Sequence, residues 1–151
     1  LDLRRVRVAE LLGGVRRRFA ARLGESGRPL VVVPVDGVTV DGDAMRLEQA
    51  LANLVENAIQ HGGGEITLSA SETGGEVEIH VEDQGPGFPP ELIDRAFERF
   101  SRGDPARAGD GTGLGLAIVE AIALAHRGSA HAANRNGSGA DVWIELPSAT
   151  R

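Results

Sequence analysis

The sequence predicts one domain that combines α-helices with a β-sheet. Three segments place their apolar residues at helical spacing, one pair of segments alternates apolar and polar residues, and another pair flanks an Asn-Gly turn. The chain has 151 residues, enough to bury one hydrophobic core, and no linker divides it. We therefore expect residues 1–151 to form a single α/β domain.

The first predicted helix covers residues 6–24. Its apolar side chains share one face, its arginines lie mostly opposite, and glycines between positions 24 and 27 end it. The apolar positions are Val8, Leu11, Leu12, Val15, Phe19 and Leu23. Short apolar strands are expected at 30–33 and 38–40, after which Asp43 is a suitable N-cap for the next helix.

The central helix is predicted at residues 44–61, where one apolar stripe is followed by Gly62-Gly63-Gly64. Its members are Leu47, Leu51, Leu54, Val55 and Ala58. Residues 65–71 and 76–83 then alternate with period two around a Thr-Gly-Gly turn. These two segments should pair as a hairpin.

The last third predicts a short helix after Pro89-Pro90, a further helix at 114–125 and a closing hairpin. The hairpin joins residues 129–134 and 140–146 around Asn136-Gly137. Residues 101–112 are polar, contain arginine and glycine and show no periodicity. We expect this segment to be a mobile loop.

Composition excludes several classes of function. A formal net charge of -6 argues against broad electrostatic binding to nucleic acid or an anionic membrane. No cysteine is present, which suits a reducing cytoplasm, and no apolar run approaches the roughly 20 residues that span a bilayer. All 16 basic residues are arginine, so the chain lacks the lysine of a Walker A phosphate loop.

Polar residues line one edge of the central helix. Asn53, Asn57 and Gln60 share a stripe, and His61 lies at its edge. This stripe is either a solvated face or the wall of a cleft. Two asparagines four positions apart are unusual within a helix, and an amide oxygen is a suitable Mg²⁺ ligand.

Asp83 ends the apolar face of its predicted strand and precedes a turn that contains Gly85 and Gly87. A buried carboxylate needs a hydrogen-bond donor, and the exocyclic amine of a purine is one candidate. The other interpretation is that Asp83 only caps the turn.

A glycine-rich run, Asp110-Gly-Thr-Gly-Leu-Gly-Leu-Ala-Ile118, opens the helix at 114–125. Such a run lets backbone amides approach a phosphate, although it is also compatible with a merely flexible helix entry. Leu116 occupies the place of the third glycine of a dinucleotide motif, and no strand leads into the run, so a Rossmann site is disfavoured. Arg102 and Arg107 could reach phosphate oxygens or face water.

Together these motifs resemble those of sensor histidine kinases, in the same order and spacing. Residues 53–61 resemble the N box, 83–87 the G1 box, 97–100 the F box and 110–118 the G2 box. The resemblance covers nearly the whole chain and implies their catalytic, ATP-binding domain. The implied fold is the Bergerat fold, a two-layer α/β sandwich whose mixed, mostly antiparallel sheet is covered on one face by about three helices.

The resemblance also implies the ligands. Asn57 would coordinate Mg²⁺, Asn53, Gln60 and His61 would border the phosphates, and Asp83 would accept from the adenine amine of ATP. The remaining implied positions are Gly85, Gly87 and Phe88 in the base pocket, Gly111, Thr112, Gly113, Leu114, Gly115 and Leu116 in the phosphate turn, and Arg102 near the γ-phosphate. Residues 101–112 would form the ATP lid, and Asn57 and Arg102 would be the catalytic residues.

Two positions depart from the family pattern. Gln60 stands where the family often has a lysine, and Asp110 adds a negative charge, so both predict weaker nucleotide binding. None of the four histidines has the acidic neighbour of a phosphoacceptor histidine. We therefore expect the acceptor on a separate dimerisation domain, with a response regulator downstream.

The resemblance further implies a monomeric domain of a homodimeric parent, on the cytoplasmic side of a membrane-bound sensor. The alternatives are an anti-sigma-factor serine kinase or another ATPase of the same fold, and a nucleotide-binding module without transfer activity.

Overall fold

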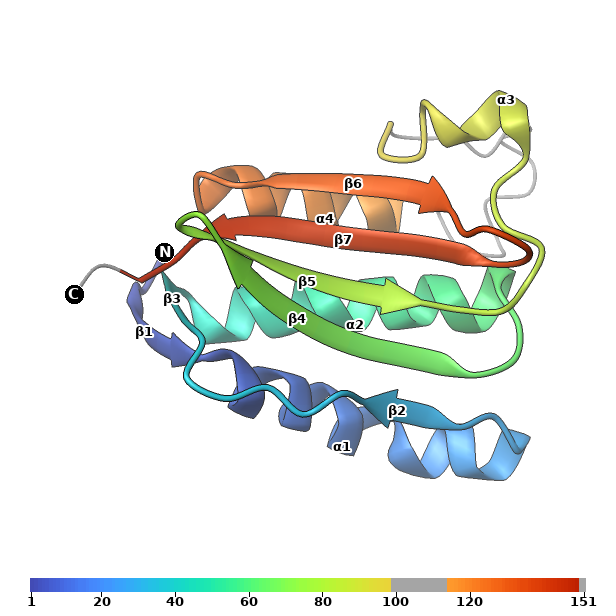
Figure 1. The fold of residues 1–151 in the computed structure, drawn as a ribbon, viewed down its shortest axis with the longest axis horizontal. Helices are drawn as coiled ribbons and strands as arrows, with labels where there is room; N and C mark the ends of the chain where they lie inside the picture. The colour runs from blue at the N-terminus through green and yellow to red at the C-terminus, as the bar shows by residue number, and fades with distance from the viewer. Residues whose placement is uncertain (99–113, 150–151) are drawn as a thin grey trace.

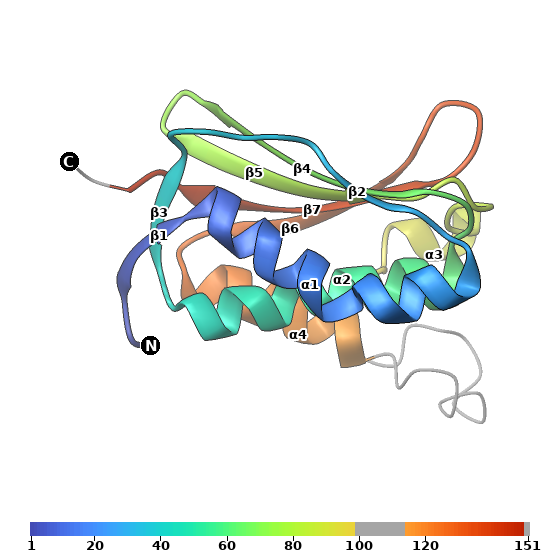
Figure 2. The same ribbon diagram turned by 90° about the horizontal axis from the view of Figure 1, so that it is seen from below.

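The computed structural model describes residues 1–98 and 114–149, with no side-chain description for Leu114. Two layers make up the fold, a sheet and a layer of helices beneath it (Figures 1 and 2). The helices are α1 (Val8–Ser26), α2 (Ala44–His61), α3 (Pro90–Ile93) and α4 (Leu114–Ala125). The strands are β1 (Arg4–Arg7), β2 (Leu30–Val32), β3 (Thr39–Gly42), β4 (Ile66–Thr73), β5 (Glu76–Glu82), β6 (Ser129–Asn134) and β7 (Ala140–Pro147).

The main sheet has five strands in the order β2-β4-β5-β7-β6. Only β2 and β4 run parallel, and every other neighbouring pair is antiparallel. Both expected hairpins are present, β4 with β5 and β6 with β7. The helices α1, α2 and α4 cover one face of this sheet, which confirms the predicted sandwich (Figure 2).

Two short segments differ from the sequence-based expectation. Residues 6 and 7, expected to begin the first helix, instead belong to β1, which pairs with β3 and places Val6 opposite Val40. Helix α1 therefore begins at Val8 and continues past Gly24 to Ser26. Gly27, at φ 72°, ends it in the left-handed conformation that suits glycine.

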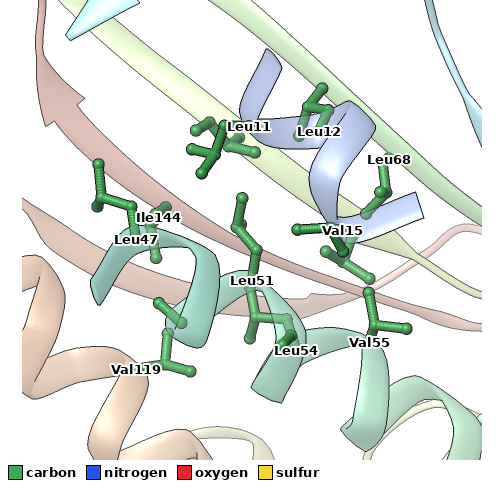
Figure 3. Close-up of a cluster of buried hydrophobic side chains, with 14 of the residues drawn as sticks. Leu11, Leu12, Val15, Leu47, Leu51, Leu54, Val55, Leu68, Val119 and Ile144 are labelled. Carbon is green, nitrogen blue, oxygen red and sulfur yellow. The ribbon is translucent and has the colours of Figure 1, made fainter. Parts of the chain in front are cut away.

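The hydrophobic core lies between the two layers. The apolar stripe of α2 faces both the sheet and its neighbouring helices, with Leu47, Leu51 and Val55 completely buried. Leu11, Leu12 and Val15 of α1 and Val119 of α4 meet this stripe, and Leu68 and Ile144 come from the sheet (Figure 3). This packing fixes the position of α2 along its whole length.

The face of the sheet opposite the helices carries a row of rings. His80 stacks on Trp143, which stacks in turn on His131, with centroid distances of 4.9 Å and 5.3 Å. Both ring nitrogens of His80 lie 2.7 Å from carboxylate oxygens, of Asp141 and Glu78. Burial lowers the pKa of His80, but hydrogen bonds to Asp141 and Glu78 outweigh it, so the pKa is raised above its ordinary value.

The two ends of the sandwich differ. The N-terminus and the end of β7 lie at one end, whereas the opposite end gathers the C-terminal end of α2, the end of β5 and the connection between β6 and β7 (Figure 1). Among the described residues, no helix is both long and apolar enough to cross a membrane. The turn after α2 and the turn from Asp83 to Phe88 lie at the second end, so the candidate site is sought there.

Candidate functional site

Two glycine turns pack directly against each other at this end of the sandwich. A Cβ atom added to Gly85 would lie 2.5 Å from backbone atoms of Gly62 and Gly63. A Cβ atom added to Gly62 would lie 2.6 Å from Oδ2 of Asp83. Only glycine permits these approaches, so the turn after α2 forms a backbone wall against the turn after β5.

Asp83 sits at the base of this wall with 4% of its surface exposed. Its Oδ1 accepts a hydrogen bond from the Gly85 backbone N–H at 2.7 Å, so the residue does cap the turn. No described residue donates a hydrogen bond to Oδ2. Capping and ligand recognition are therefore compatible, because each can use its own carboxylate oxygen.

Asn57 lies on α2 five residues before Gly62, about 7.5 Å along the helix axis. It is half-buried, and no described residue hydrogen-bonds its side chain. Among residues 1–98 and 114–149, no group of three or more histidine, cysteine, aspartate or glutamate residues could hold a metal ion. An ion at the Asn57 amide oxygen would therefore take its other ligands from water and from phosphate oxygens, as Mg²⁺ commonly does.

The other polar residues of α2 differ in how far they are buried. Asn53 is half-buried, and its Nδ2 donates to the backbone carbonyl of Gly115 at 3.3 Å. This bond ties the first turn of α4, and thus the end of the glycine-rich run, to α2. Gln60 and His61 are exposed at the C-terminal end of the helix.

Of the predicted phosphate turn, the structure describes only residues 114–116, at the start of α4. Gly115 has open space around it, whereas the Leu116 side chain is buried in the core at 5% exposure. The Leu116 side chain therefore belongs to the core and does not line the predicted phosphate turn. Arg102, Gly111, Thr112 and Gly113 lie outside the described residues, as does the rest of the expected lid.

The residues predicted for the base pocket adopt a defined backbone conformation. Gly87 has a positive φ of 78°, and Phe88 is half-buried and packs against the core. The Phe88 backbone is held by hydrogen bonds to Asn134 in both directions. The structure therefore assembles Asn57, Asp83, Gly85, Gly87 and Phe88 at one end of the fold.

Several residues that hold the site were not predicted from the sequence. Arg28 donates to the carbonyl oxygens of Ala58, Ile59 and Gly64, at 3.3, 3.2 and 3.0 Å, and so closes the C-terminal end of α2. The last residue of β6 and the turn that follows it, residues 134–139, are together called the β6–β7 loop, and this loop contacts the turn after β5. One sequence signal indicated this contact. The loop has a glycine at position 139 in addition to Gly137 of the expected turn.

Comparison with known proteins agrees with this geometry. Residues 42–150 match the family model described as histidine kinase-, DNA gyrase B-, and HSP90-like ATPase. The sensor histidine kinase component HK1 of Mycobacterium tuberculosis is 42% identical over 127 residues, which cover 84% of this chain and 76% of that protein. The histidine-protein kinase BaeS of Escherichia coli is 38% identical over 143 residues, 91% of this chain and 30% of that protein.

A solved structure gives the same result in three dimensions. The catalytic domain of histidine kinase ThkA superposes with a TM-score of 0.86 at 27% identity, over 99% of this chain and 97% of that one. This chain corresponds to most of HK1 and to about a third of BaeS. The chain belongs to the histidine kinase-, DNA gyrase B- and HSP90-like ATPase family, and within it to the catalytic ATP-binding domains of sensor histidine kinases.

Proposed function

We propose that residues 1–151 form one catalytic domain that binds Mg·ATP and delivers the γ-phosphate to a histidine on a separate dimerisation domain. One observation carries the proposal: a buried carboxylate, Asp83, has one oxygen engaged by its own turn and the other, backed by Gly62, without a described donor. An adenine amine would satisfy that second oxygen. Family membership and the neighbouring Asn57 support the same conclusion.

The part of the proposed site that receives the adenine base is formed by backbone and by the carboxylate of Asp83. Oδ2 of Asp83 accepts from the adenine amine, while Gly85 and Gly87 keep the walls of the pocket free of side chains and Phe88 packs beside them. The domain has no need of a lysine here, because recognition of the base uses a carboxylate and close-packed glycines.

The phosphate end is proposed to centre on Asn57. Its amide oxygen ligates Mg²⁺, and Asn53, Gln60 and His61 border the phosphates. We also assign contacts with the phosphates to residues 111–116, and contact with the γ-phosphate to Arg102, as the family motifs imply. Phosphoryl transfer depends mainly on positioning and on charge stabilisation, so these groups are sufficient for the nucleotide half of the reaction.

The partners follow from the chemistry. The acceptor histidine and its dimerising helices belong to another domain of the parent protein, which we propose to be a homodimer that passes phosphate to a response regulator. Histidine kinase ThkA has been solved in complex with the response regulator TrrA, which supports this kind of partner. We place the domain on the cytoplasmic side of a membrane-bound sensor, where ATP is present, and expect it to be monomeric when isolated.

A second candidate function is nucleotide binding without transfer. Gln60 is exposed at the place where the family often has a phosphate-contacting lysine, so one cationic contact is missing. An anti-sigma-factor serine kinase is less well supported, since the named relatives are sensor histidine kinases.

Two measurements test the proposal. Calorimetry of the chain with ATP, with and without Mg²⁺, should show metal-dependent binding, and absence of binding would refute it. Radiolabelled ATP should then label a dimerisation domain of the parent added in trans, in an acid-labile manner, but should not label this chain alone. Binding without any transfer would favour the second function, and acid-stable label on the partner would favour a serine kinase.

A further inference from the structure

We propose that the β6–β7 loop is a positioning element for nucleotide binding, and that Asn134 is its principal positioning residue. The loop, residues 134–139, would hold the turn from Asp83 to Phe88 in the conformation that receives the base. This inference rests on the proposed function, because it concerns the turn assigned to the adenine. The loop itself carries none of the residues that the family motifs assign to the ligand.

Asn134 pairs with Phe88 as a neighbouring strand would. Its Oδ1 accepts from the Phe88 backbone N–H at 2.7 Å, and its Nδ2 donates to the Phe88 carbonyl oxygen at 3.0 Å. One amide side chain thus satisfies both backbone groups of a residue beyond the end of β5. A Cβ atom on Gly87 would lie 2.6 Å from Oδ1 of Asn134, so glycine at 87 is needed for this pairing.

The rest of the loop holds the start of the same turn. Arg135 donates to the Asp83 carbonyl oxygen at 2.8 Å, and its Nε lies 3.3 Å from a carboxylate oxygen of Glu82. The Ser138 hydroxyl lies 2.7 Å from the carbonyl oxygen of Gly85 and 3.1 Å from that of Gln84. Gly139 packs against the Asp83 carbonyl with no room for a Cβ atom.

These hydrogen bonds hold both ends of the turn. The loop engages backbone carbonyls at positions 83, 84, 85 and 88 and the backbone N–H at 88. A turn containing Gly85 and Gly87 samples many conformations by itself, because glycine restricts the backbone least. Bonds from a separate hairpin select one of these conformations before the nucleotide arrives, and preorganisation of this kind raises affinity.

The side chain of Asn134 reaches backbone and not ligand, so its effect on binding should be indirect. Three variants separate this role from simple stabilisation. Asn134→Ala removes both bonds. Asn134→Asp keeps the shape and the acceptor for Phe88 N–H but places an oxygen against the Phe88 carbonyl. Asn136→Ala is the matched control, since Asn136 is exposed in the same loop and no hydrogen bond of its side chain is described.

The test compares ATP affinity, amide hydrogen exchange and Tm in the full chain. We expect Asn134→Ala and Asn134→Asp to weaken ATP binding about tenfold, measured well below Tm, and to speed exchange of the Gly85 and Phe88 amides. Asn136→Ala should bind ATP as the unchanged chain does. A loss of ATP affinity together with faster exchange in both Asn134 variants supports the inference.

Other results overturn it. If the Asn134 variants have a lower Tm but bind ATP normally, the loop only stabilises the fold. If Asn134→Asp behaves as the unchanged chain, or if Asn136→Ala loses as much affinity as Asn134→Ala, the paired hydrogen bonds are not what positions the turn. Failure of the unchanged chain to bind ATP is a separate outcome, which refutes the proposed function and the inference that rests on it.

Discussion

Replacement of Gly62 by alanine should push the buried carboxylate of Asp83 out of place. The added Cβ atom would lie 2.6 Å from Oδ2 of Asp83 and 2.7 Å from the Ala58 carbonyl oxygen. Non-bonded atoms do not approach so closely, so one side of the contact must move. Gly62 has φ -98° and ψ -160°, an extended conformation that alanine also adopts, so the substitution tests this contact and not backbone strain.

The size of the expected loss in stability depends on how firmly the neighbours of the new Cβ atom are held. Asp83 cannot swing freely, because its Oδ1 is bonded to Gly85 and its backbone N–H donates to Ala140. Overpacking of this kind costs about 1–3 kcal/mol of folding free energy. Displacement of Oδ2 should also weaken ATP binding by about tenfold or more, because the acceptor no longer meets the adenine amine.

Denaturant unfolding and ATP calorimetry measure the two effects, and two further glycines serve as controls. Gly24→Ala lies inside α1 with nothing within 4 Å of the new Cβ atom, so it should leave ATP binding unchanged and stabilise the chain by up to about 1 kcal/mol. In Gly63→Ala the new Cβ atom would lie 3.3 Å from the Gly85 Cα atom, so the losses of stability and ATP affinity should be smaller than those of Gly62→Ala but larger than those of Gly24→Ala. If Gly62→Ala has the same unfolding free energy and the same ATP affinity as the unchanged chain, the contact between Gly62 and Asp83 has no role in holding Asp83.

Four other substitutions or conditions test the site and the fold. Asn57→Ala should abolish Mg²⁺-dependent ATP binding but change the unfolding free energy by less than about 1 kcal/mol, because Asn57 lies beside the core stripe; unchanged affinity by calorimetry would refute its assignment. Asp83→Asn should weaken ATP binding by about 1–3 kcal/mol, with a much smaller effect on inosine triphosphate, and equal losses for both nucleotides would mean that Asp83 only holds the turn. The raised pKa of His80 means that its contribution to stability is complete below about pH 6.5 and is lost as pH rises through the folded-state pKa; His80→Gln should remove this part of the pH dependence in denaturant titrations, and an identical profile would contradict it. Arg127 has φ 63° just after α4, so Arg127→Gly should raise the unfolding free energy by about 0.5–1 kcal/mol, and a lower Tm would count against strain at that position.

Local sequence signals predicted most of the helices and strands. The bounds of α2 and α4 agree with their apolar periodicity because glycines and an N-cap mark their ends, and Asp43 does accept from the Arg46 N–H at 3.2 Å. The β4–β5 hairpin follows from strict alternation around Gly74-Gly75. Strand β1 was missed because its pairing with β3 joins residues far apart in the sequence, and Val6 also fits the helical stripe that follows.

The candidate site was predictable only in its ligand-facing residues. Asn57 lies in a helix interior and Asp83 on the apolar face of a strand. Polar residues are unusual in both places, so the sequence alone identified them as candidates. Arg28 and Asn134 are not unusual where they stand. Their roles arise from contacts across 30 or more positions, Arg28 with the end of α2 and Asn134 with Phe88, which periodicity cannot reveal.

Helix α2 provides the common frame of the proposed site. Asn53 bonds Gly115 of the phosphate turn, Asn57 faces the proposed metal, and Gly62 backs Asp83 at the base end. All three lie on or directly after one helix whose adjacent apolar stripe is buried, so their mutual spacing is set by the helix and held by the core. Asn53 thereby links the first turn of α4 to the same helix. A chain without lysine can still offer a nucleotide a rigid binding surface, because that rigidity comes from backbone contacts and core packing rather than from cationic side chains.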